Sequence, residues 1–490
     1  MKISNDSRQA NAAKTPRPQR SWADQISLWA LKAGGAIVAR HFSDALRDML
    51  RAEWLPAEKL QERTEARLSS LLKHAAENVP FYRETYRRLG CRSSQLRTIS
   101  DLRQLPVVSK ETFRGRPLPD FLASNIPEHR RLEWTTSGST GDPFRFFLDR
   151  QATPSVLASH FFYDSWFGIG PFDRSVRIMA PPVVPQSIPK NTSLAARLRY
   201  SIHSRLRSHF KRLTERRFSM FDLDEGRAEE IYHVIKDFRP KYILGYTSTI
   251  ANIADALLRR KLPLNHRLRG VVTIAETLTN ERKRLIEDYF NCPIINRYGQ
   301  REFEFWCAQS CFESPFQFHV NTELVVWEVL REDGTPAAEG ELGRVVITNL
   351  HNYVMPFIRY DTGDLAVAGA QRCACGRGFP LVGQLEGRSL ECVQTVSGVM
   401  INPVSLGQYL FVSNDYVDVV RHYQLVVDAP GRMRLLVVPT ERFDQQKHES
   451  LTEDMTRLLG DGVSVAIETV DEIPLEKSGK RPIIKLTRAA

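Results

Sequence analysis

The feature that most constrains the fold of this chain is an alternation of strand and helix patterns between residues 221 and 296. Short apolar runs at 242–246, 270–274 and 293–296 are typical of buried strands, and the segments at 250–258 and 280–290 have helical spacing of their apolar residues. Strands that alternate with helices form a parallel sheet with helices on its faces. We therefore expect an α/β fold.

Polar residues follow each of these strands. Thr247 and Ser248 come after the first strand, residues 275–277 after the second and residues 298–302 after the third. In such sheets ligands bind at the carboxyl ends of the strands. The sequence therefore predicts a binding site where these segments meet.

A glycine-rich loop lies upstream, at residues 135–141. It contains five hydroxyl side chains and two glycines. Glycine lets backbone N–H groups approach an anion closely, and hydroxyls add donors, so such a loop suits a polyphosphate. It is not a Walker A loop, because no Gly-Lys-Ser/Thr closes it. Taken alone, the loop could equally be a polar surface turn.

Composition and length indicate more than one domain. Residues 1–21 are polar and basic, which predicts a mobile tail, and residues 22–385 are expected to form one large domain with an antiparallel region at 320–368. Residues 386–490 read as a separate small α+β domain, with a hairpin turn at 430–431 and a helix at 449–459.

The formal net charge of +11 favours anionic partners such as a nucleotide, coenzyme A or acidic lipid. Nucleic acid is not expected, because no zinc-finger, RNA-recognition or basic-zipper pattern is present. The basic segment 186–217 has helical spacing, and residues 190–217 could contact a membrane surface or form a solvated helix face. An odd count of seven cysteines and no secretory signal predict a cytoplasmic protein.

Five motifs occur in order along the chain: residues 135–143, Tyr298-Gly299-x-x-Glu302, Tyr360-x-Thr362-Gly363-Asp364, Gly387-Arg388 and Ser478-Gly479-Lys480. This ordered set resembles the adenylate-forming superfamily of acyl-CoA synthetases. Residues 78–82 and 238–246 are similar to its phenylacetate–CoA ligase branch, which includes CapK-like proteins of polysaccharide gene clusters. The resemblance covers most of residues 65–490.

The resemblance implies a large AMP-binding domain, with mixed and parallel sheets, followed by a small mobile α+β domain. It implies that ATP and Mg²⁺ activate a small-molecule carboxylic acid as an acyl-adenylate, and that coenzyme A then takes the acyl group. Relatives are often dimers, so a homodimer is also implied.

Site residues carry over one by one. Ser137, Gly138, Ser139, Thr140 and Gly141 would hold the phosphates, and Ala275, Glu276, Tyr298 and Gly299 would lie around the adenine. Asp364 would bind the ribose, Arg388 would lie near ribose and phosphate, and Glu302 would help to hold Mg²⁺. Lys480, Glu302 and Thr136 would be catalytic, with Lys480 bridging carboxylate and α-phosphate. Taken alone, each of these residues could instead be an ordinary turn or surface residue.

The hinge departs from the family pattern. Leu390 and Glu391 follow Gly387-Arg388-Ser389 where the family commonly has Asp, and Ser397 replaces an expected basic residue. The acceptor step is therefore less supported than adenylation. One alternative is a CapK-like enzyme of polysaccharide biosynthesis with an acceptor other than coenzyme A. Another is a non-catalytic scaffold with a basic membrane-binding face.

Thiols and an imidazole point to a metal site. Cys373 and Cys375 form a Cys-x-Cys pair, and Cys311 and His319 lie upstream, with Cys307 as a substitute ligand. Such ligands suit tetrahedral Zn²⁺, and some members of this branch resemble the chain here in holding a structural zinc. The alternative is a set of free buried cysteines.

An aromatic-rich helix follows the glycine-rich loop. It carries Tyr163, Trp166 and Phe167, which could line an acid pocket, although aromatics in such a helix more often form core.

Overall fold

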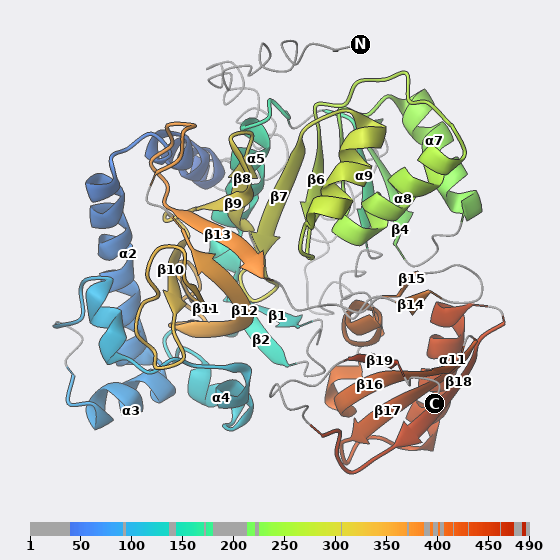
Figure 1. Ribbon diagram of the computed structural model, residues 1–490. Helices are drawn as coiled ribbons and strands as arrows, with labels where there is room; N and C mark the ends of the chain where they lie inside the picture. Colours follow the sequence, from blue (N-terminus) through green and yellow to red (C-terminus); the bar gives the residue numbers. More distant parts are fainter. Residues whose placement is uncertain are drawn as a thin grey trace, which may run out of the picture.

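The computed structural model describes residues 40–91, 95–136, 144–170, 173–179, 213–220, 225–304, 306–369, 372–386, 393–394, 400–401, 406–414, 416–429, 431–460, 462–474 and 483–486. Within these ranges the chain builds an eleven-stranded sheet with the order β10-β11-β12-β13-β9-β8-β7-β6-β5-β3-β4. Figure 1 shows a second, smaller sheet apart from it, near the C-terminus.

One half of the large sheet is parallel. Its strands are β3 (Ser175–Met179), β4 (Glu215–Ser219), β5 (Tyr242–Tyr246), β6 (Gly270–Ile274) and β7 (Ile294–Gly299). Helices α7 (Glu225–Phe238), α8 (Thr247–Arg259) and α9 (Asn280–Phe290) connect them, as Figure 1 shows. Every residue of β5 and β6 is buried: Ile243 and Val271 belong to one apolar cluster with residues of α7, α8 and α9, and Leu244 and Val272 belong to a second cluster. The predicted parallel α/β region is confirmed.

Strand β4 corrects one prediction. The basic segment 186–217 was expected to be helical. Its residues 213–214 are helical, but residues 215–217 belong to β4, at the edge of the sheet beside β3. The carboxylate of Glu215 lies 3.0 Å from Arg177 Nε of β3, and the Arg216 guanidinium lies over the Phe238 ring. Pairing with a sheet edge therefore outweighs the local helical pattern. The rest of the segment, 186–212, lies outside the described residues.

The other half of the sheet is antiparallel. Its strands are β8 (Trp306–Cys311), β9 (Ser314–Val320), β10 (Val325–Leu330), β11 (Leu342–Asn349), β12 (Tyr360–Ala368) and β13 (Leu381–Glu386). The antiparallel region predicted at 320–368 is confirmed by the pairing of β10 with β11 and of β11 with β12.

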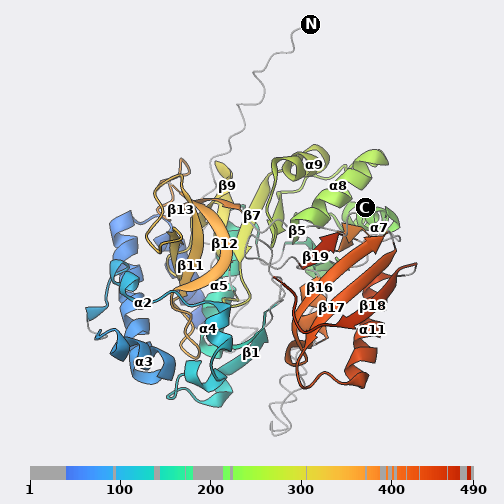
Figure 2. The same ribbon diagram turned by 60° about the horizontal axis from the view of Figure 1, so that its bottom comes forward.

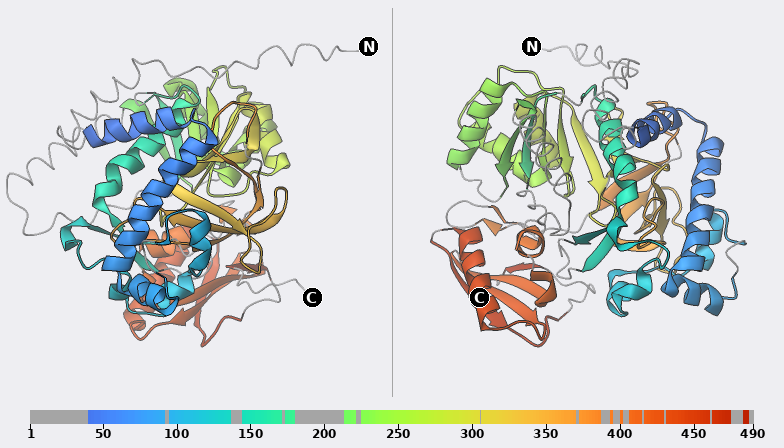
Figure 3. Two further views of the ribbon diagram at one scale, coloured as in Figure 1. Left: turned by 90° about the vertical axis from the view of Figure 1, so that its left-hand side faces the viewer. Right: turned by 180° about the vertical axis from the view of Figure 1, so that it is seen from behind.

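Helices and a hairpin complete the large part. Residues 40–52 are helical and precede α2 (Ala57–Asn78) and α3 (Pro80–Arg88), followed by α4 (Lys110–Arg114) and α5 (Thr153–Ser165). Strands β1 (Arg131–Thr135) and β2 (Arg145–Asp149) form an antiparallel hairpin around the glycine-rich loop. Figure 3 shows α5, in teal, along the sheet face seen from behind. Short turns of helix lie at Ser100–Gln104, Leu118–Phe121, Glu128–Arg130, Arg150–Ala152, Gln408–Ser413 and Tyr416–Asp418.

The C-terminal part has a sheet of its own. Strands β16 (Val420–Ala429), β17 (Arg432–Pro439), β18 (Ser464–Thr469) and β19 (Ile484–Leu486) form its sheet, and β14 (Val393–Gln394) pairs with β15 (Met400–Ile401). Figure 2 shows α11 (Gln445–Leu459) beside this sheet, where Leu451 and Met455 are buried. The helix begins before residue 449 because Asp444 caps it by accepting from Lys447 N.

No helix in the described ranges is long and apolar enough to cross a membrane. The expected tail, residues 1–21, lies outside these ranges. Residues 22–39, at the start of the expected large domain, also lie outside these ranges. The division of the chain at residue 386 stays a prediction.

Candidate functional site

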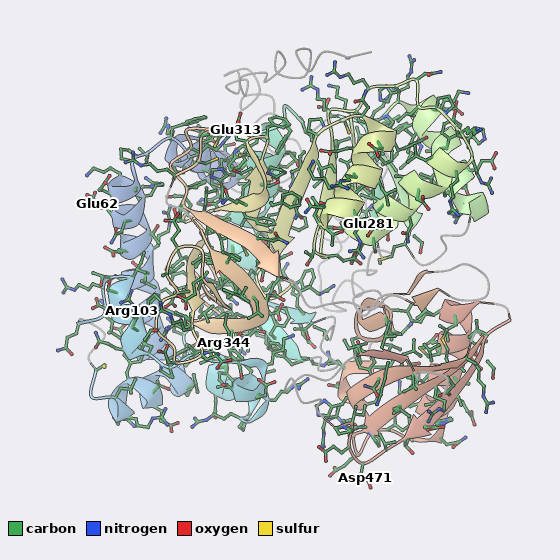
Figure 4. All side chains as sticks on the ribbon, in the orientation of Figure 1. Glu62, Arg103, Glu281, Glu313, Arg344 and Asp471 are labelled. Atoms are coloured by element: carbon green, nitrogen blue, oxygen red, sulfur yellow. The ribbon has the colours of Figure 1, made fainter. Side chains whose placement is uncertain are left out.

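The carboxyl ends of β5, β6 and β7 lie level with one another. Tyr246 pairs with Ile274 and Ile274 pairs with Arg297, so the polar segments that follow these strands meet at one edge of the sheet. In Figure 1 the arrowhead of β7 points toward the C-terminal part, and Glu281, labelled in Figure 4, marks the same edge at the start of α9.

Glu276 joins the ends of β5 and β6. Its carboxylate accepts hydrogen bonds from Ser248 N (2.6 Å) and Ser248 Oγ (2.9 Å), and its carbonyl accepts one from Thr247 Oγ1. The carboxylate thus neutralises the N-terminal end of α8, where a helix favours negative charge. Ala275 has a φ of 66°, a left-handed conformation that costs energy for alanine and that clusters at functional sites.

Tyr298 and Asp364 meet beside β7. Tyr298 Oη donates to Asp364 Oδ2 over 2.7 Å, and Gln300 Nε2 donates to both groups, at 2.9 Å and 2.8 Å. Burial, and then the charge of Asp364, raise the pKa of Tyr298 well above its usual value, so the phenol keeps its proton and donates. The Asp364 carboxylate is therefore held in one orientation at the end of β7.

Glu302 lies one turn further on and is buried. Its Oε1 atom accepts a 2.9 Å hydrogen bond from Tyr360 Oη and lies 4.0 Å from Lys110 Nζ. Lys110 reaches this place because Val108 N donates to the carbonyl of Arg359, next to Tyr360. A buried carboxylate oriented in this way fits a hard cation such as Mg²⁺, which prefers oxygen ligands.

Thr136 closes the base of the glycine-rich loop. Its Oγ1 accepts from Phe144 N (3.0 Å), and its backbone N–H donates to the Phe144 carbonyl (3.1 Å). The loop residues Ser137, Gly138, Ser139, Thr140 and Gly141 lie outside the described residues, as do Arg388 and Lys480. The base of the loop nevertheless reaches the site, because the Arg301 guanidinium lies over the ring of Trp134, 5.0 Å from its centre.

The structure therefore brings Glu276, Tyr298, Gly299, Glu302 and Asp364 to one edge of the sheet. Sequence reasoning missed Lys110, Gln300, Arg301 and the role of Tyr360. Gln300 and Arg301 occupy the two x positions of the Tyr298-Gly299-x-x-Glu302 motif, and Tyr360 begins the next motif. Their positions within these motifs were the only indication in the sequence that they belong to the site. Nothing around Lys110 in the sequence points to Glu302.

A second polar cluster lies near the carboxyl end of β8, where His319 of β9 is paired with Gln309. The ligand atoms of Cys311, His319, Cys373 and Cys375 all lie within 4.8 Å of one another. Cys311 Sγ is 3.6 Å from Cys373 Sγ, and Cys375 Sγ is 3.4 Å from His319 Nε2. Tetrahedral Zn²⁺ would separate two sulfurs by roughly 3.8 Å and a sulfur from a nitrogen by roughly 3.6 Å. The donor set and its spacing fit zinc.

The surroundings of this cluster orient its ligands. His319 Nδ1 lies 3.3 Å from the Phe379 carbonyl, which leaves Nε2 directed at the sulfurs, as is usual for metal-bound histidine. Hydrogen bonding from Cys311 and His319 lowers the pKa of Cys375, which favours the thiolate that binds metal. The proposed substitute ligand Cys307 is not a member of the cluster that the described residues form.

Residues that follow Cys375 in sequence contact Glu53, which precedes the region of family resemblance. Arg377 Nε donates to Glu53 Oε2 over 2.8 Å, and Gly378 N donates to the Glu53 carbonyl over 2.7 Å. The Arg377 guanidinium lies 4.0 Å from the centre of the Trp166 ring. Trp166 and Tyr163 are buried in this region, so the aromatic residues of α5 form core here.

Comparisons with known proteins agree with this arrangement. The CapK C-terminal domain family matches residues 394–486. A phenylacetate-coenzyme A ligase of Thermus thermophilus is 25% identical over 426 residues, covering 82% of this chain and 86% of its own. Protein CapK of Staphylococcus aureus is 20% identical over 418 residues, covering 85% and 86%. The structure of 2-hydroxyisobutyryl-CoA ligase with 2-HIB-AMP and CoA aligns with a TM-score of 0.58 and 20% identity, over 89% of this chain and 92% of that one, so the fold is shared.

Proposed function

We propose that this chain is a member of the phenylacetate–CoA ligase and CapK-like family of adenylate-forming proteins, to which it is similar over most of its length. On this premise it activates a carboxylic acid with ATP and transfers the acyl group to coenzyme A. The observation that carries the proposal is the meeting of Asp364, Tyr298 and Glu302 at the carboxyl ends of parallel strands, beside the base of the glycine-rich loop.

In the first step a carboxylate oxygen attacks the α-phosphorus of ATP, and the bond from that phosphorus to the bridging oxygen breaks. Acyl-adenylate and pyrophosphate result. In the second step the thiol of coenzyme A replaces AMP at the acyl carbon and loses its proton, which gives a thioester. Each step conserves the acyl group and needs no redox partner.

We propose these roles for the side chains. Asp364, held by Tyr298 and Gln300, accepts hydrogen bonds from the ribose hydroxyls. Glu302, ordered by Tyr360 and Lys110, is the ligand for Mg²⁺, which would neutralise phosphate charge when bound. The backbone around Ala275 and Gly299 would flank the adenine, because the Glu276 carboxylate is already engaged by Ser248. The glycine-rich loop, Arg388 and Lys480 keep the roles that the resemblance implies.

A second candidate differs only in the acceptor. The match of residues 394–486 to the CapK C-terminal domain favours a CapK-like role in polysaccharide biosynthesis, in which another nucleophile replaces coenzyme A. The altered hinge at Leu390 and Ser397 fits this alternative.

We further propose that Cys311, His319, Cys373 and Cys375 hold one structural Zn²⁺, supported by their mutual spacing. Such a metal would cross-link β8, β9 and the segment after β12, and so fix the end of the sheet opposite the nucleotide. It would take no part in the reaction.

Membrane contact through 190–217 and a homodimer remain secondary proposals. Membrane contact is supported by Arg216 and Arg217, which lie on the edge strand β4 at the described end of segment 190–217. Co-sedimentation with anionic vesicles and light scattering test them.

The function is tested by pyrophosphate release with a panel of carboxylic acids, first without and then with coenzyme A. We expect acid-dependent release, a thioester product and no release from Lys480→Ala. Release without a thioester would favour the second candidate. No release with any acid, from protein that binds no ATP, would favour the non-catalytic scaffold.

A further inference from the structure

A cavity of about 400 Å³ borders the end of the β1–β2 hairpin that lies away from the glycine-rich loop. Its lining comes from α2, from residues 125–130, from the end of β2 and from the segment that connects β11 to β12. Small-molecule sites have volumes of about 300–1,000 Å³, so the cavity is large enough for such a ligand. Thr135 pairs with Arg145 next to the loop, whereas Arg131 pairs with Asp149 beside the cavity. Four residues of strand, roughly 13 Å, therefore separate the cavity from the base of the loop.

Hydrogen bonds between these elements hold the walls of the cavity in place. Asp149 is buried and accepts from Arg130, at 3.2 Å from Nε and 2.5 Å from Nη2. Asn352, in the segment after β11, donates from Nδ2 to the Phe147 carbonyl of β2 over 2.9 Å. The cavity is therefore formed before any ligand arrives, which lowers the entropic cost of binding.

Three uncharged polar side chains of the lining make no hydrogen bond within the described part of the chain. They are the hydroxyl of Tyr353 and the amides of Asn125 and Gln151. Burial raises the pKa of Tyr353, and the charges of Arg67 and Asp149 act on that pKa in opposite directions, so the hydroxyl lies near both side chains. These three polar groups are available to a ligand.

The charges of the described lining cancel. Arg130 and Asp149 form an ion pair, and the nearby Arg67 is paired with Glu323, with 2.7 Å between Nη2 and Oε2. Burial lowers the pKa of His351, which keeps its ring neutral, and its Nε2 lies 3.0 Å from the Glu323 carbonyl. Because a carbonyl only accepts, Nε2 carries the proton and Nδ1 is left as an acceptor. This lining offers no unpaired charge for an anion or a metal cation.

A neutral lining that both donates and accepts matches hydroxyl groups, since each hydroxyl does the same. An amide offers N–H donors and a carbonyl acceptor, and a phenol offers one donor and an acceptor. We propose that this cavity binds a neutral polyhydroxylated molecule, a sugar of one or two rings. Tyr353 and Gln151 hydrogen-bond its hydroxyls, and Ile126 and Ala152 contact its C–H groups. The inference is independent of the proposed function, because the lining contains none of the residues given a role in that reaction.

The experiment measures binding to the full chain in the absence of ATP and acid. Calorimetry and saturation-transfer NMR are applied with glucose, galactose, mannose, N-acetylglucosamine and inorganic phosphate. The variants Tyr353→Phe and Gln151→Ala each remove one proposed partner of the sugar. Tyr289→Phe is the matched control, because the Tyr289 hydroxyl lies on α9, outside the lining, and donates to the Leu262 carbonyl over 3.0 Å. Thermal melting of each variant supplies a second measurement.

We expect at least one of the four sugars to bind and phosphate not to bind. Tyr353→Phe and Gln151→Ala should each weaken sugar binding by about 3- to 10-fold, which corresponds to the loss of one hydrogen bond. Tyr353→Phe should melt at the wild-type temperature, because the hydroxyl has no partner among the described residues. Tyr289→Phe should show the opposite pair of results, a lower melting temperature and wild-type affinity for the sugar.

The double variant Tyr353→Phe/Gln151→Ala decides whether a bound sugar occupies this cavity. Wild-type affinity of a folded double variant would place the sugar elsewhere and overturn the inference. A folded wild type that binds none of the four sugars, or phosphate binding that the same substitutions weaken, would also overturn it. Pyrophosphate release is not measured here, so the proposed function stands or falls on its own experiment.

Discussion

Arg145, on the strand that leaves the glycine-rich loop, donates two hydrogen bonds to Asp418 of the C-terminal part, from Nε and Nη2, each 2.9 Å long. Arg145 also pairs with Glu133 across the β1–β2 hairpin. The β1–β2 hairpin and the C-terminal part are therefore joined by a pair of hydrogen bonds between residues that lie 273 positions apart in sequence.

Asp418→Asn should loosen this tie. Because both side chains are partly exposed, we expect a stability loss of no more than about 1 kcal/mol, but a larger change in the placement of the C-terminal part. Small-angle scattering with and without ATP measures that placement. Asp428→Asn, which breaks a comparable pair with Arg434 inside the C-terminal sheet, is the control. Identical scattering of Asp418→Asn and wild type would contradict the role given to this pair.

Asp364→Asn should weaken ATP binding. A hydrogen bond to a charged group contributes about 1.5–3 kcal/mol, so KM for ATP should rise by about 10- to 100-fold while kcat changes less. Tyr298→Phe should have the same effect more weakly, since it removes only the donor that orients the carboxylate. Steady-state kinetics with ATP and with 2′-deoxy-ATP check this, and a wild type that does not distinguish the two nucleotides would argue against ribose recognition by Asp364.

Glu302→Gln should remove the dependence of turnover on Mg²⁺, together with most of the turnover. Tyr360→Phe should keep activity but require about 10-fold more Mg²⁺, because it removes a hydrogen bond that orients the ligand. Titration of pyrophosphate release with MgCl₂ measures both effects. The reverse order, with Tyr360→Phe the more damaging variant at saturating Mg²⁺, would count against Glu302 as the ligand.

Zinc should be recovered with the purified protein at about one ion per chain, and Cys373→Ser should lose it. Chelation should lower the melting temperature of wild type but not that of the variant. Cys292→Ser replaces a buried free cysteine outside the cluster and should retain zinc. Metal analysis by mass spectrometry measures the zinc content. The assignment would be refuted if the wild type contained no zinc and Cys373→Ser melted at the wild-type temperature.

Acid should destabilise the fold partly through His160. Burial lowers the pKa of His160 to about 4, whereas the unfolded chain binds this proton near pH 6.5. Between about pH 6.5 and pH 4 the unfolded state therefore binds one more proton at this residue than the folded state does. The contribution of His160 to the free energy of unfolding is complete above about pH 6.5 and is lost as the pH falls toward 4. His160→Gln should lose less stability than wild type between about pH 7 and pH 5, by up to about 2 kcal/mol.

Urea unfolding at the two pH values measures this difference. His129→Gln alters an exposed histidine and should follow wild type. Equal acid sensitivity of wild type and His160→Gln would show that other groups dominate.

Local pattern alone determined much of this protein. The strands at 242–246 and 270–274 and the helix at 280–290 were predicted to the residue, because a strand buried on both faces is a continuous apolar run and a helix buried on one face repeats its apolar residues at helical spacing. The Cys and His residues of the metal cluster were likewise predicted from their types and spacing. Local pattern failed at residues 215–217, where pairing with a sheet edge formed a strand at the end of a segment with helical spacing.

Tertiary structure decided the partners of each site residue. Tyr298 and Asp364 are separated by 66 residues, and no pattern in either segment encodes their 2.7 Å hydrogen bond. The same holds for Lys110 beside Glu302 and for Arg301 over Trp134. Periodicity records which face of an element is buried, but the contact between two distant side chains depends on the register and packing of every element between them. The sequence thus determined the elements and the types of chemistry, and packing alone decided which groups act together.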